Sequence, residues 1–134
     1  MHSIILYALT LPVLAVLDFL WIGVIAKPWY AASMGTLLSE SPVWWAAIAF
    51  YLLYSAGLVF FVINPALESS SLLRAVLVGA FFGFIAYMTY DLTNIATTTG
   101  WPIGIALLDL AWGTVAAAAT SGVVYLLATK LFTF

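Results

Sequence analysis

The chain has no cysteine, a single histidine and very few charged side chains. Of its 134 residues, 6% are charged and 66% are hydrophobic. The absence of cysteine excludes disulfide frameworks, thiol redox chemistry and cysteine-ligated metal centres. His2 lies at the extreme N-terminus, so we predict no imidazole-bound metal or haem and no cofactor. Three basic residues are too few to follow a phosphate backbone, which excludes nucleic acid as a partner.

The remaining composition is typical of an integral membrane protein. Soluble domains carry about 25% charged residues, whereas this chain has too few to coat a globule in water. The coat is therefore expected to be the lipid bilayer. We predict an all-α, polytopic membrane protein with four transmembrane helices in an antiparallel bundle, forming a single domain over residues 1–134. Because residues before Asp18 carry no basic cluster, the first apolar stretch is expected to be a retained span rather than a cleaved signal.

Four apolar stretches are long enough to cross the hydrocarbon core, which needs roughly 20 helical residues. They cover about residues 3–26, 43–63, 72–96 and 103–128. The longest connection, from Lys27 to Pro42, is expected to hold at most a short interfacial helix.

Proline and glycine mark the expected ends of these spans. Lys27-Pro28 is expected to end the first span, Ser41-Pro42 to begin the second and Asn64-Pro65 to end it. The segment Gly100–Pro102 predicts a tight turn before the fourth span.

Charged and aromatic residues suggest which end of the bundle faces which side. Arg74, Lys130 and the N-terminal amine fall at one end and Lys27 at the other, so the positive-inside rule places both termini in the cytoplasm. An aromatic belt is expected at the opposite face, made of Trp29, Tyr30, Trp44, Trp45 and Trp101.

Three aspartates fall inside the predicted spans, which is the most informative feature of the sequence. On insertion scales an aspartate at a span centre costs about 2.5–3.5 kcal/mol. At 1.5 Å per residue, Asp18, Asp91 and Asp109 lie roughly 8–14 Å below the same membrane face. We therefore expect three helices to bring carboxylates to one level, where protonation or a bound cation compensates them.

Polar and aromatic residues occur three or four positions from these aspartates, on the same helical faces. They predict a polar pocket in the non-cytoplasmic half of the bundle. Its predicted ligand-binding residues are Asp18, Trp21, Tyr51, Tyr54, Tyr87, Asp91, Asn94, Asp109 and Trp112.

Two repeated patterns accompany the pocket. The stripe Gly79-x-x-x-Gly83, with Gly113 on the next span, is typical of helices whose backbones approach closely in lipid. Asp-x-x-Trp occurs in both the first span, at Asp18, and the fourth, at Asp109, which is compatible with an inverted internal duplication.

The chain resembles a group of small bacterial membrane proteins, domain-of-unknown-function family 2177. The resemblance is carried by the segments at residues 18–23, 26–30, 50–57, 87–94, 100–102 and 109–113, among which Tyr-Asp-Leu-Thr-Asn at 90–94 is the most specific. It implies a four-span protein of the bacterial inner membrane and assigns no activity.

Three functional hypotheses follow from these features. The first is binding or transport of a small cationic or polar amphiphilic ligand, for which a chain this small is expected to form a homodimer. The second is a membrane enzyme acting on a lipid with an aspartate as general base; the sequence offers no nucleophile–base pair, metal motif or cofactor fingerprint, so a non-enzymatic role is favoured. The third is a structural or assembly partner in which the aspartates only hold helices together.

Overall fold

The computed structural model describes residues 2–35 and 43–132, and all regular structure in these ranges is helical. The elements are α1 (His2–Leu20), the π-helical η1 (Trp21–Ile25), α2 (Lys27–Met34), α3 (Trp44–Leu58), the π-helical η3 (Val59–Ile63), α4 (Asn64–Glu68), α5 (Leu72–Thr97) and α6 (Ile103–Leu131). The expected start of the second span at Ser41-Pro42 lies outside the described residues.

The prediction of four membrane-spanning helices is confirmed. Helical stretches long and apolar enough to cross a bilayer cover His2–Ile25, Trp44–Glu68, Leu72–Thr97 and Ile103–Leu131. Lys27 and Pro28 do end the first span, because the chain leaves η1 at Ala26 and begins the short helix α2 with proline in its first turn. That helix matches the expectation for the segment after Lys27.

The prediction that Asn64-Pro65 ends the second span is wrong. The helix continues through both residues to Glu68. A proline inside an α-helix loses a backbone hydrogen bond and clashes with the preceding turn. Here the turn before it is the wider π-helix of η3, in which the Asn64 N–H donates to the Val59 carbonyl. The wider turn leaves room for the Pro65 ring, and the helix passes through.

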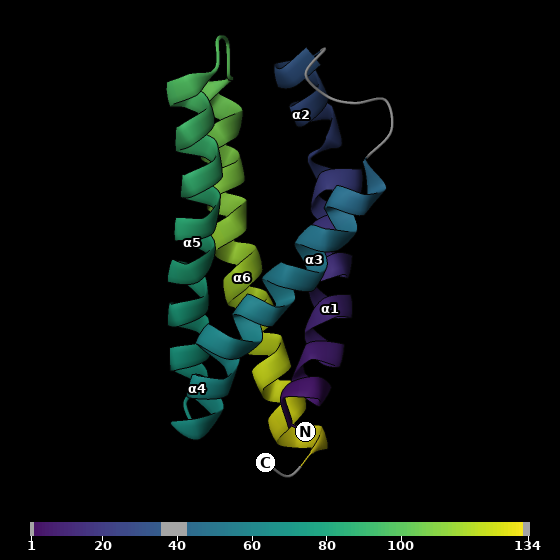
Figure 1. The fold of residues 1–134 in the computed structure, drawn as a ribbon, viewed down its shortest axis with the longest axis vertical. Coiled ribbons are helices and arrows are strands. Elements are labelled where there is room, and N and C mark those ends of the chain that lie inside the picture. The colour runs from purple at the N-terminus through teal and green to yellow at the C-terminus, as the bar shows by residue number, and fades with distance from the viewer. Residues whose placement is uncertain (1, 36–42, 133–134) are drawn as a thin grey trace.

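Successive spans run in opposite directions, and Figure 1 shows them as two pairs, α5 beside α6 and α1 beside the second span. α5 and α6 form a hairpin whose turn contains Gly100, at φ +80°, a conformation that glycine adopts readily. α1 contacts α3 and α6, whereas the second span meets α5 through its η3 and α4 parts. The two pairs therefore converge near the chain termini and diverge toward the end that carries α2 (Figure 1).

The converging half holds the closely packed core. Leu6, Leu58, Val62 and Val124 are fully buried there. The start of α5, which contains Arg74, and the end of α6, which contains Lys130, lie toward the same end as the termini, and α2, which begins at Lys27, lies at the other end (Figure 1).

The glycine stripe brings the α5 and α6 backbones together, as predicted. A Cβ added to Gly83 would lie 2.2 Å from the Gly113 carbonyl oxygen, and one added to Gly79 would lie 2.9 Å from the Ala117 carbonyl oxygen. Only glycine fits at such separations. The close approach fixes α5 against α6 and thereby sets the relative positions of Asp91 and Asp109.

Candidate functional site

Asp18 joins three spans through hydrogen bonds. Its Oδ2 accepts from the Tyr51 hydroxyl on α3, and its Oδ1 accepts from Trp112 Nε1 on α6 at 3.1 Å. Both oxygens of the carboxylate are thus partnered by groups from the two helices that flank α1. Hydrogen bonds of this kind satisfy a polar group that would be costly to leave unpaired in lipid.

Asp109 is held by the short helix α2. Tyr30 is 7% exposed, and its hydroxyl donates to Asp109 Oδ1 at 2.8 Å. The same hydroxyl accepts from Trp21 Nε1 at 3.3 Å. Burial raises the pKa of the Tyr30 hydroxyl above its ordinary value of 10, so the group stays protonated at neutral pH and remains a donor. The sequence predicts Tyr30 in the aromatic belt at the membrane face, whereas in the structure its side chain reaches inward to a carboxylate.

The two Asp-x-x-Trp motifs exchange partners. Trp112, from the motif of Asp109, donates directly to Asp18, while Trp21, from the motif of Asp18, reaches Asp109 through the Tyr30 hydroxyl. The two indoles stack between the carboxylates, with ring centroids 4.8 Å apart and planes 8° from parallel. The motifs form one connected unit that ties α1 to α6.

This unit predicts a stability effect for Trp112→Phe, which keeps an aromatic ring at the stack and removes the donor to Asp18. We expect the variant to lose about 0.6 kcal/mol, and at most about 1.7 kcal/mol, of unfolding free energy, the range measured for hydrogen bonds between membrane helices. Unfolding by SDS titration in mixed micelles measures the loss.

The matched control is Trp45→Phe, because Trp45 is 76% exposed on α3. It should stay within about 0.5 kcal/mol of the wild type. Equal stabilities for the two variants would contradict a structural role for the bond to Asp18.

Asp91 and Asp109 meet at a cavity of about 160 Å³ between α2, α5 and α6. Tyr30, Tyr90 and Trp101 line it with them. Asp91 is 2% exposed, and its Oδ2 has no hydrogen-bond partner among the described residues. The buried Nε1 of Trp101 lies beside the Asp91 carboxylate on the same cavity but does not reach hydrogen-bonding geometry with it. Two carboxylates and an unsatisfied donor therefore face one small space.

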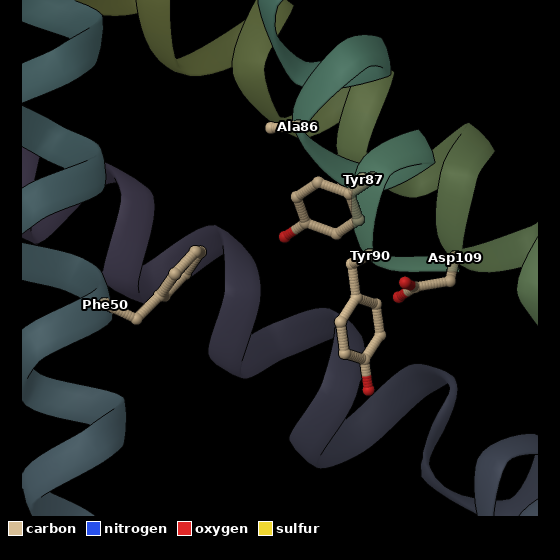
Figure 2. A pocket seen from close by; sticks show the side chains of 5 residues that line it. All are labelled: Phe50, Ala86, Tyr87, Tyr90 and Asp109. Carbon is tan, nitrogen blue, oxygen red and sulfur yellow. The ribbon is translucent and has the colours of Figure 1, made fainter. Parts of the chain in front are cut away.

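A second cavity, of about 360 Å³, adjoins the first. Asp109 and Tyr90 line both cavities, and Phe50, Ala86 and Tyr87 complete the second. Figure 2 shows the Tyr87 and Tyr90 rings projecting from α5 into the space that separates them from Phe50 on α3. This cavity occupies the region where the two helix pairs diverge, and its walls are mainly aromatic.

Among the residues that the structure describes, no basic side chain compensates the two cavity carboxylates. Within residues 2–35 and 43–132, neither Asp91 nor Asp109 forms an ion pair. Lys27 begins α2 but contributes no such contact. A buried carboxylate without a partner is energetically costly, so this cavity favours a proton or a cationic group.

The structure separates the predicted site residues into two groups. Asp91, Asp109 and Tyr87 line the two cavities, whereas Asp18, Tyr51, Trp21 and Trp112 form the hydrogen-bonded and stacked unit beside them.

The two remaining predicted residues lie away from the cavity walls. Tyr54 is buried between Phe50, Phe82 and Tyr87. Asn94 lines neither cavity; its carbonyl accepts from the Thr98 N–H at 3.0 Å near the end of α5. Asp18 is linked to Asp109 through the stacked indoles and the Tyr30 hydroxyl.

Sequence reasoning missed Tyr30 and Trp101 as cavity residues, and it left Tyr90 open between pocket lining and core. Tyr30 and Trp101 occur beside prolines at span ends, a position that is typical of interfacial anchors. Pro28 was the available signal for Tyr30, because a proline in the first turn of a helix predicts that the following residues fold back as a helix.

Comparison with known proteins shows the family and no function. No curated protein and no solved structure matches the chain. A family model described as "Predicted membrane protein (DUF2177)" matches residues 3–126, nearly the full length. The four apolar spans described above agree with that description. The chain belongs to the DUF2177 family of predicted membrane proteins.

Proposed function

We propose that this protein binds a small cationic or polar amphiphilic ligand in the cavity between Asp91 and Asp109, in the non-cytoplasmic half of the membrane. The observation that carries the proposal is Asp91 itself, a carboxylate that is 2% exposed, lines a cavity and has an unpartnered oxygen. An ammonium group supplies both the positive charge and the hydrogen-bond donors that this oxygen lacks.

The contrast between the aspartates supports binding rather than a packing role at this cavity. Asp18 has partners for both oxygens, as a purely structural carboxylate should. Asp91 has one oxygen without a hydrogen-bond partner, although a carboxylate that only stabilises helices also needs partners for both oxygens. Intramembrane carboxylates that face a cavity mark ligand, ion or proton sites in other membrane proteins. A structural role therefore fits Asp18, and a ligand role fits Asp91 and Asp109.

Binding of methylammonium to the purified protein in nanodiscs tests the proposal. At a ligand concentration a hundred times the dissociation constant, the native state should gain about 2.7 kcal/mol, which appears as a rise in the melting temperature that saturates with concentration. Acetate, which has similar size and opposite charge, should give no rise. The absence of any saturable rise across methylammonium, tetramethylammonium and guanidinium contradicts the proposal.

Transport is the extension of this proposal, since a ligand bound at mid-depth can leave toward either side. Proteoliposomes loaded with a pH-sensitive dye should report proton release when methylammonium is added outside. Binding without flux would contradict transport and leave the proposed binding site in place.

A further inference from the structure

We infer that the ligand is a single-chain alkyl amine, with its ammonium group at Asp109 and Asp91 and its chain in the groove between the second span and α5. The inference rests on the proposed function and adds the chemical class of the ligand and the path of its tail. It is carried by a row of three adjoining cavities whose walls change from charged to apolar.

The row begins at the carboxylates. The 160 Å³ cavity and the 360 Å³ cavity share Asp109 and Tyr90, so an ammonium group at Asp109 stands where the two meet. Known small-molecule sites occupy about 300–1,000 Å³. The smaller cavity alone is below this range, which fits a headgroup rather than a whole ligand.

The row continues along α5 into apolar surroundings. Ala86 lines both the 360 Å³ cavity and a third cavity of about 440 Å³. The third cavity is lined by Phe61 of η3 and by Val78, Phe81, Phe82, Ile85 and Ala86 of α5, without any polar side chain. Ala86 is thus the junction through which an extended chain passes from the aromatic cavity to the apolar groove.

The exposed fractions of the cavity residues indicate that the alkyl chain of the ligand enters from the side. Phe50 is 40% exposed and Tyr90 is 54% exposed, and these residues flank the middle cavity on α3 and α5. Because both rings line the cavity, their exposure shows that the cavity is open at its side, and in a membrane acyl chains would reach this opening. An amphiphile dissolved in the bilayer can therefore slide its tail between α3 and α5 while its headgroup reaches the carboxylates.

Photo-crosslinking with decylamine carrying a terminal diazirine tests the path, with mass spectrometry of the labelled peptides. Label is expected on residues 78–86 of α5 and at Phe61. Asp91→Asn should reduce this labelling at least about tenfold, because the headgroup loses a charged partner. Ala86→Phe narrows the junction and should reduce the labelling about fivefold or more, and an unliganded melting temperature close to that of the wild type shows that the variant is folded.

The matched control is Ala111→Phe, an equal change at an exposed position of α6 that lines none of these cavities. It should leave the labelling unchanged. If Ala86→Phe fails to fold, Ala86→Leu replaces it with a smaller side chain.

The outcomes separate this inference from the proposed function. Methylammonium binding together with label spread evenly over lipid-facing residues, or label in the groove that neither variant reduces, overturns the tail path and leaves the cation site in place. Labelling of either kind would reflect ordinary contact with an amine that is dissolved in the membrane. If methylammonium does not bind to the wild type, the proposed function and the inference fail together.

Discussion

Replacing Asp91 by asparagine is expected to weaken methylammonium binding at least about 30-fold without unfolding the protein. Removing one partner of a buried charge pair typically costs 2–5 kcal/mol of binding free energy, and 1.4 kcal/mol corresponds to a factor of ten. Asparagine has nearly the shape of aspartate and removes a carboxylate that is costly to bury. The melting temperature of the unliganded variant should therefore equal or exceed that of the wild type.

Asp18→Asn provides the matched control, since it makes the same chemical change in another span. Asp18 accepts two interhelical hydrogen bonds and lines neither of the two carboxylate cavities. This variant should lose stability and keep its affinity for methylammonium. Two variants with opposite effects distinguish a ligand-binding carboxylate from a structural one. If both lose stability and neither loses affinity, the aspartates serve only to hold the helices together.

The Gly83→Ala variant is expected to lose stability because its new side chain has no room against α6. The added methyl group would lie 2.2 Å from the Gly113 carbonyl oxygen and 2.6 Å from Ala117 Cβ. Neither neighbour is the end of a flexible side chain, so α5 and α6 must move apart. Overpacking of this kind typically costs 1–3 kcal/mol, which unfolding in mixed micelles can measure.

Gly104→Ala is the control for this change. Gly104 lies in α6, the helix against which Gly83 of α5 packs, but a Cβ at Gly104 meets nothing within 4 Å. Alanine there should be neutral or slightly stabilising, because it reduces the freedom of the unfolded chain. Equal stability of the Gly83 and Gly104 variants would contradict the close approach of α5 and α6.

The spans and the small-residue contact could be predicted because they depend on local patterns. An apolar run of sufficient length specifies a spanning helix whatever surrounds it, and Gly79 with Gly83 marks a close approach without naming the partner residue. The prediction at Pro65 is wrong because the effect of this proline depends on the π-helical turn before it. No residue type in that turn indicates a π-helix.

The organisation of the candidate site depended on contacts that are distant in sequence. The aspartates were recognisable singly, because a charge inside an apolar span is exceptional. The sequence did not indicate which aspartates share a cavity, because the contacts that position them are distant in the chain. Trp112 and Asp18 are 94 residues apart, and Tyr30 and Asp109 are 79 residues apart. The exchange of partners between the two Asp-x-x-Trp motifs likewise follows from how α1 crosses α6, which the sequence does not specify.

The most direct measurement of the central claim is the NMR response of the carboxylates themselves. The chain contains three aspartates, so labelling with aspartate enriched in ¹³C at Cγ gives three signals, which the Asp→Asn variants assign. On addition of methylammonium to the protein in nanodiscs, the Asp91 and Asp109 signals should shift with a common dissociation constant, while that of Asp18 stays in place. Three unmoved signals, or a shift confined to Asp18, would contradict a cation site between α5 and α6.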